Sequence, residues 1–102
     1  MNEEEAAAFG KAVGDATRQR ILRFCCCERR SVGEVAVHSE ITQPTATHHL
    51  GILEKAGLVT RIQEGKSAYY SVDQRQLVSC CGQLLRCLAP DEKGTKALNR
   101  CC

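Results

Sequence analysis

The sequence is poor in aromatic residues and histidines, and it contains no long hydrophobic run. It has 102 residues, with two tyrosines, two phenylalanines, no tryptophan and three histidines. So few aromatic side chains disfavour binding of single-stranded nucleic acid by base stacking. No stretch is long enough to cross a membrane, so we expect no membrane partner. The acidic residues 1–5 lack a following apolar run, which predicts no signal peptide and a cytoplasmic location.

The sequence also lacks a large excess of positive over negative charge. The formal net charge is +2, so the chain as a whole is not a basic coat for nucleic acid. Any affinity for DNA must come from a local patch that a dimer would double. Arg61, Lys66, Lys55 and the adjacent His48 and His49 are candidates for such a patch, although a solvated surface would show the same charges.

Cysteine, by contrast, is abundant. The eight cysteines form one triplet, two adjacent pairs and a single residue. Neighbouring cysteines cannot easily bridge each other without strain. Because no export signal is predicted, the pattern favours reduced thiols that bind soft metal ions or undergo redox chemistry.

Residues 42–58 carry the strongest helical pattern. Thr42 is a suitable N-cap, Pro44 falls in the first turn, and Gly57 provides a stop. An apolar stripe faces the core and consists of Ala46, Leu50 and Leu53. The front of this helix is polar and consists of Gln43, Thr45, Thr47, His48 and His49. Such side chains reach base edges when a helix tip enters the major groove, although an ordinary amphipathic surface helix remains an alternative.

The flanks of this helix predict a winged helix. Residues 31–36 form a capped short helix and residues 39–42 a turn, which together with the next helix give a helix-turn-helix. Residues 58–63 and 67–72 alternate as strands around a turn at Gly65. The expected fold is mostly α with a β-hairpin wing, about five helices and two strands.

The remaining helices are expected to pair two chains. Residues 3–13 form a first helix, and Asp15 caps a second that the cysteines at 25–27 close. Asp73 opens a last helix to about residue 88. A stripe suited to helix pairing consists of Leu77, Cys81, Leu84 and Leu88. Residues 1–90 are therefore expected to form one homodimeric DNA-binding domain, and residues 91–102 a flexible tail that contains cysteines.

Five segments in this order resemble one family. They are VGDATRQRIL at 13–22, SVGEVA at 31–36, QPTATHHL at 43–50, LEKAGLV at 53–59 and EGKSAYY at 64–70. Together they resemble the ArsR/SmtB family of winged-helix repressors. The resemblance implies a homodimer on double-stranded operator DNA that leaves when an inducer binds. It also implies that the chain is no enzyme and requires no cofactor.

Two inducer sites known in the family are missing. Many arsenic-responsive relatives carry a cysteine pair where this chain has Ser31, Val32 and Gly33. Zinc-sensing relatives place histidine after an aspartate on the last helix, whereas Gln74 and Arg75 follow Asp73 here. The inducer must therefore use other groups.

The leading candidates are Cys101 and Cys102, with Cys80, Cys81 or Cys87 as a possible third ligand. Trivalent arsenic takes three sulfurs, and a methylated form needs only two. The predicted inducer is As(III), Sb(III) or a trivalent methylarsenical, and the predicted role is arsenic resistance. Incidental tail thiols, core packing of Cys25 and interface packing of Cys81 are the alternatives.

Three alternative functions make different demands on the sequence. Persulfide-sensing relatives pair a thiol of the second helix with one of the last, which suggests Cys25 and Cys87 as a redox alternative in a repressor of the same fold. A small thiol enzyme would need a base, and no cysteine lies beside a histidine in the sequence. A protein-binding winged helix would not need the polar front of residues 43–49.

Overall fold

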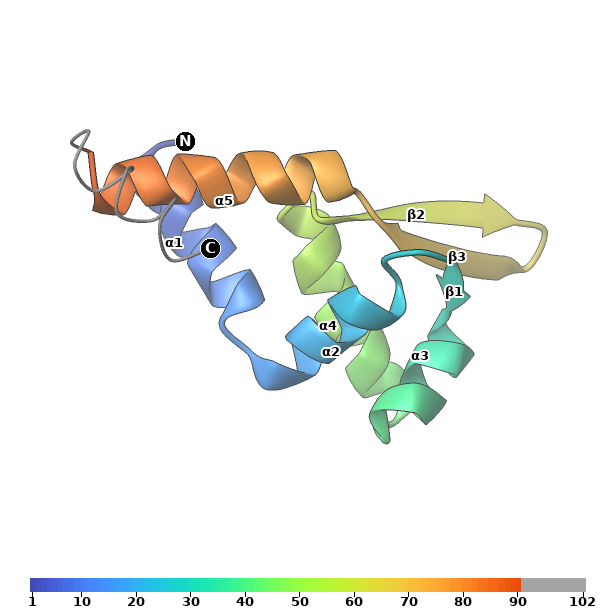
Figure 1. Cartoon of the computed structure of the whole chain (residues 1–102). Coiled ribbons are helices and arrows are strands. Elements are labelled where there is room, and N and C mark those ends of the chain that lie inside the picture. The colour runs from blue at the N-terminus through green and yellow to red at the C-terminus, as the bar shows by residue number, and fades with distance from the viewer. Residues whose placement is uncertain (91–102) are drawn as a thin grey trace.

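The computed structural model describes residues 1–90, which form five helices and three strands (Figure 1). In chain order these elements are α1 (Glu3–Val13), α2 (Ala16–Phe24), β1 (Arg30–Ser31), α3 (Val32–Ser39), α4 (Gln43–Lys55), β2 (Val59–Glu64), β3 (Ser67–Val72) and α5 (Gln74–Leu88). The predicted winged helix-turn-helix is confirmed, and one strand is added to the two that were expected. The thiol pair Cys101 and Cys102 lies outside the described residues.

Every one of these helices begins with a polar side chain that accepts a hydrogen bond from a free backbone N–H. Asparagine, aspartate, serine and threonine fill this position, in the order Asn2, Asp15, Ser31, Thr42 and Asp73. In α1 and α3 a glutamate three residues later returns the bond and completes a capping box. Each cap is worth about 0.5–2 kcal/mol, so local chemistry fixes where the helices start.

The wing is a hairpin of β2 and β3 to which β1 adds a short third strand. The strand order is β1-β3-β2, and Val59 pairs with Val72 at the base of the hairpin. Gly65 has φ 58° in the turn, a conformation that glycine adopts without steric cost. Arg30 pairs with Tyr70, so the segment before α3 is hydrogen-bonded to the middle of the wing.

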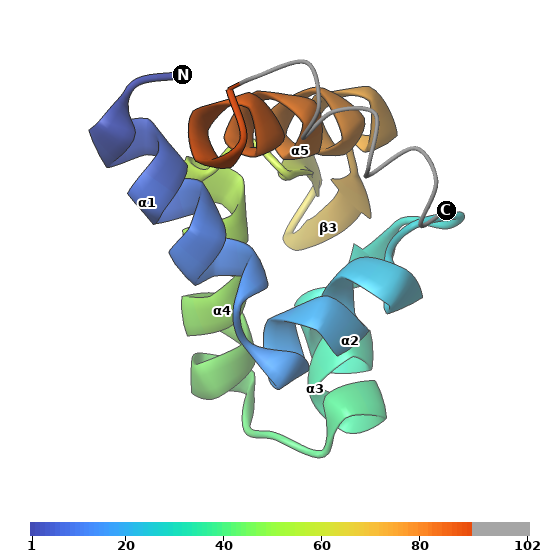
Figure 2. The ribbon, with the colours of Figure 1, turned by 60° about the vertical axis from the view of Figure 1, so that its left-hand side comes forward.

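The elements fall into two groups around this sheet. Helix α5 continues from β3 and extends away from the hairpin, and α1 packs against it (Figure 1). Helices α2, α3 and α4 pack together on one side of α5, and α3 lies farthest from it (Figure 2). The helix-turn-helix and wing therefore form one part of the chain, and α1 with α5 the other.

The core connects the two groups, because Phe9 of α1 and Cys80 of α5 belong to the same buried cluster as Leu50 of α4. The largest side chains that are fully buried are Ile21, Leu50, Leu53, Leu58, Val35 and Cys25. Ala46, Leu50 and Leu53 are each 0% exposed, so the predicted apolar stripe of α4 is confirmed. Within residues 1–90, we find no helix with the length and apolar character needed to cross a membrane.

Helix α5 differs from the expectation in one respect. The cysteine that it buries against its own chain is Cys80, whereas Cys81 is exposed. Leu77 and Leu84 are half-buried, and Leu88 is 74% exposed. The stripe that includes Cys81 is therefore left largely uncovered by a single chain.

Candidate nucleic-acid interface and thiol sites

The front of α4 presents a polar surface. Gln43, Thr45, Thr47 and His48 are all exposed, and they lie on the helix whose opposite side is fully buried. At the tip, the Thr42 hydroxyl donates to the Thr45 hydroxyl at 2.9 Å and accepts from the Thr45 N–H at 3.3 Å. Because the buried side fixes the orientation of the helix, these exposed side chains form a defined surface.

His49, the fifth predicted DNA-contacting residue of α4, has a different environment. It is half-buried, and Arg18 Nη1 donates to its Nδ1 at 3.1 Å. An accepting Nδ1 requires a neutral imidazole with its proton on Nε2. Burial lowers the pKa of His49. The charge of Asp15 raises this pKa, whereas the charge of Arg18 lowers it. His49 is therefore held inside the packing between α2 and α4.

Arg18 is a positioning residue that the sequence reasoning did not identify. It is only 8% exposed, and its guanidinium donates to the Ala12 carbonyl and the Lys11 carbonyl, each at 2.8 Å. It thus joins the end of α1 to α2 and, through His49, to α4. Arg18 precedes Leu22 by four residues and Cys25 by seven, which places all three on the same side of α2. This helical spacing could have identified Arg18 as a buried residue.

The wing carries the other predicted contacts. Lys66 is exposed beside the turn, and Arg61 Nη2 donates to the Gln63 side-chain oxygen at 2.7 Å. Glu64 forms a two-point ion pair with Arg29, and this hydrogen bonding lowers the pKa of Glu64. The tip of the wing is therefore attached to the loop before β1, which sequence reasoning also missed.

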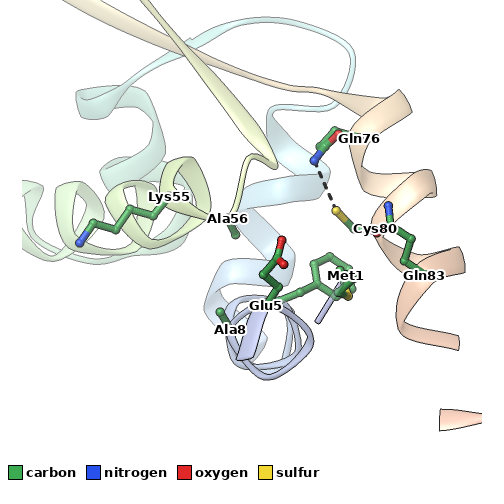
Figure 3. A pocket seen from close by; sticks show the side chains of 9 residues that line it. Met1, Glu5, Ala8, Lys55, Ala56, Gln76, Cys80 and Gln83 are labelled. Atoms are coloured by element: carbon green, nitrogen blue, oxygen red, sulfur yellow. Dashed lines mark hydrogen bonds between the residues drawn. The ribbon is translucent and has the colours of Figure 1, made fainter. Parts of the chain in front are cut away.

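The thiols of α5 do not converge. Cys80 borders a cavity of about 180 Å³ between α1 and α5, where Gln76 Nε2 donates to its Sγ at 3.5 Å (Figure 3). Cys81 is exposed, and Cys87 donates to the Met1 carbonyl at 3.8 Å. Within the part of the chain that the structure describes, no three side chains of His, Cys, Asp or Glu come together as a metal site.

The cysteine triplet lies at the other end of α5. Cys25 caps α2 and is 0% exposed, and burial raises the pKa of its thiol to about 11. Its predicted role in core packing is confirmed. Gln74 Nε2 donates to the Cys26 carbonyl at 2.8 Å, whereas Cys87 lies roughly 20 Å further along the helix axis. One chain does not bring Cys25 and Cys87 together, so the redox pair would require two chains.

The comparisons with known proteins agree with this architecture. Residues 15–61 match the family model described as bacterial regulatory protein, arsR family. A probable mercury resistance operon repressor of Streptomyces lividans is 34% identical over 88 residues, which cover 86% of this chain and 70% of that one. The arsenical resistance operon repressor of Staphylococcus aureus is 27% identical and covers 72% of this chain and 70% of its own length.

A solved structure extends the comparison. The homodimeric winged helix-turn-helix DNA-binding domain Mb0332 of Mycobacterium bovis is 26% identical, with a TM-score of 0.69 and coverage of 87% of this chain and 82% of that one. The shared fold includes the helix-turn-helix and the wing described above. The chain therefore belongs to the arsR family of bacterial regulatory proteins and is a winged-helix, DNA-binding transcription regulator rather than an enzyme.

Proposed function

We propose that the protein is a homodimeric repressor that leaves its operator when trivalent arsenic or antimony, inorganic or methylated, binds cysteine thiolates. The DNA-binding part of this proposal rests on the surface of α4. Its apolar side is fully buried, and its front presents exposed Gln43, Thr45, Thr47 and His48. A rigid helix with an exposed polar front beside a wing is the geometry that reads a major groove.

The chemistry of this surface suits double-stranded DNA. The Gln43 amide can pair with adenine in the major groove, and threonine side chains hydrogen-bond bases or contact the thymine methyl. Arg61 and Lys66 lie on the wing, where they would contact phosphates or the minor groove. Since the net charge is only +2, binding should depend on these local cations and on two copies of the patch.

A second copy of the chain would cover α5. Leu88 is 74% exposed, and an apolar side chain at such exposure gains most from burial in an interface. The relative from Mycobacterium bovis is a homodimer. Two α4 helices held by one interface would read two half-sites about one helical turn apart.

The proposed inducer site consists of Cys101 and Cys102, with a third thiol from α5. Of the three α5 candidates, Cys81 and Cys87 are exposed and Cys80 is buried, which favours the first two. Two thiols suit a methylarsenical, and three suit arsenite or antimonite. The mercury and arsenical resistance repressors among the relatives support an inducer that binds thiols. Coupling is reciprocal, so bound DNA weakens inducer binding equally.

Fluorescence anisotropy of the fully reduced protein on its own upstream DNA tests this proposal. We expect near-stoichiometric arsenite to release the wild-type protein and the Asn99→Ser control, and to leave C101S/C102S bound. Release of the double variant would overturn the site assignment. Tight DNA binding that only an oxidant reverses would instead support the redox-sensing repressor.

A further inference from the structure

The loop between α2 and β1 contains a pair of close thiols that the proposed inducer site does not use. The Sγ atoms of Cys26 and Cys27 are 3.1 Å apart. Cys26 is half-buried and Cys27 is exposed, so reagents in solution can reach both. Their hydrogen bond raises the pKa of Cys26, and both cysteines are free thiols.

The separation suits one soft centre bound by both sulfurs. With metal–sulfur bonds of about 2.3 Å, two sulfurs on one tetrahedral or pyramidal centre lie roughly 3.5 Å apart. The observed 3.1 Å requires only a small side-chain adjustment. The loop offers no third accessible sulfur, because Cys25 is 0% exposed and burial raises the pKa of its thiol to about 11.

An apolar groove lies next to the pair. It has a volume of about 570 Å³, and Cys26, Cys27, Leu22, Val72, Leu77 and Val78 are among the residues that line it. Such a groove can accept a hydrocarbon group, and its two other lining residues, Arg23 and Gln74, add neither a thiol nor a carboxylate. The site therefore combines two sulfurs with an apolar wall. A trivalent centre that already carries one carbon substituent needs two sulfur ligands and an apolar surface for that substituent.

We infer that Cys26 and Cys27 form a dithiol site for a trivalent arsenical with a single organic substituent. Two As–S bonds form and two As–O bonds break, and each thiol proton leaves with a hydroxyl group as water. Arsenic remains trivalent, so the step needs no oxidant or reductant. This site goes beyond the proposed function, because it uses neither Cys101 nor Cys102.

The position of the loop connects this site with DNA binding. The Cys25 carbonyl accepts from the Val72 N–H at 3.2 Å, and the Cys26 carbonyl accepts from Gln74 at the start of α5. Arg29, in the same loop, is paired with Glu64 at the tip of the wing. An arsenical that pulls the two sulfurs onto one centre therefore acts on the segment between wing and α5, and we expect it to weaken DNA binding.

Native mass spectrometry of the full chain tests the site, with phenylarsine oxide as the probe and C101S/C102S as the background. This background removes the tail thiols, so failure of the tail assignment and failure of this site are distinguishable. We expect one tightly bound phenylarsenic group per chain. Adding Cys26→Ser or Cys27→Ser should weaken binding at least tenfold, and adding Cys81→Ser or Cys87→Ser should leave it unchanged.

Two results would overturn the inference. If the adduct persists in Cys26→Ser and disappears in Cys81→Ser, the arsenical binds α5 instead. If arsenite binds this background as tightly as phenylarsine oxide, the requirement for an organic substituent is wrong. Anisotropy in the same background gives the functional readout: the probe should release DNA, and Cys26→Ser, which should bind DNA normally without the probe, should abolish that release.

Discussion

Helices α4 and α5 both carry an apolar stripe, but the chain treats the two stripes differently. The stripe of α4 is 0% exposed at Ala46, Leu50 and Leu53. On α5, within residues 1–90, only Cys80 is buried, and Leu88 is 74% exposed. A single chain thus completes the packing of α4, the helix proposed to contact DNA, and leaves α5 less fully covered.

This difference separates two requirements of a regulator. The reading surface must keep its shape in every state, so its helix is fixed by intrachain packing. In the proposed mechanism the relation between the two α4 surfaces changes when an inducer binds, and this change would depend on the less fully packed helix α5.

Truncating a buried side chain of α4 should have the largest effect on the free energy of unfolding. Leu50→Ala leaves a cavity at a position that is 0% exposed, and such substitutions cost about 2–5 kcal/mol. Urea denaturation followed by circular dichroism should show this loss in the free energy of unfolding. Val37→Ala, at a position that is 81% exposed, is the matched control and should stay within about 0.5 kcal/mol of wild type. A small loss for Leu50→Ala would mean that the core is not well packed.

A charge on the uncovered side of α5 should separate the chains without unfolding them. Burying a leucine is worth about 1.5–3 kcal/mol, so Leu88→Glu should raise the dimer dissociation constant roughly ten- to hundredfold. Sedimentation velocity over a concentration series measures this change. Val37→Glu carries the same charge on α3 and should leave the dimer intact. Equal dissociation of the two variants would show that charge alone, and not the α5 surface, is responsible.

Changes to the front of α4 should affect DNA binding alone. Gln43→Ala removes an exposed amide and should cost about 1–3 kcal/mol of affinity for the operator, with relaxed specificity at one base pair. Lys66→Ala on the wing should weaken binding uniformly and reduce the salt slope by about one. Anisotropy titrations at several salt concentrations distinguish the two. If Gln43→Ala weakened all sequences equally, its base-reading role would be wrong.

Acidification should produce the smallest effect, through His49. Its pKa is lowered from 6.5 in the folded chain, so below that value the unfolded chain binds more protons. The contribution of neutral His49 to stability is complete above 6.5 and is lost as the pH falls below it. Unfolding midpoints at about pH 5.5 and about pH 7.5 should differ less in His49→Gln, which keeps an acceptor for Arg18 without titrating in this range. An unchanged difference would assign the effect to other groups.

Much of the fold could be predicted because local chemistry determines it. Asp15, Ser31, Thr42 and Asp73 precede helices in the sequence and cap them in the structure. The hairpin turn at Gly65 and the burial of Leu50 follow from equally short-range patterns. These features need only a few neighbouring residues, so a single sequence contains enough information for them.

The rest depends on contacts between distant segments. Strand β1 has only two residues, too few for an alternation pattern, and it exists because Tyr69 and Tyr70 of β3 lie beside it. Periodicity placed Cys81 on an apolar stripe, but it could not tell which side of α5 faces its own chain. The closeness of Cys26 and Cys27 in space depends on side-chain conformations after α2 ends, which no helical pattern describes.

The short strand β1 also has a consequence for how the chain folds. Pairing of Arg30 with Tyr70 closes a loop that contains all of α3, α4 and β2. Such a long-range contact should form late, because closing a large loop costs conformational entropy before other contacts offset it. The wing is therefore not an independent hairpin. Its central strand and α4 should acquire protection from hydrogen exchange in the same cooperative step.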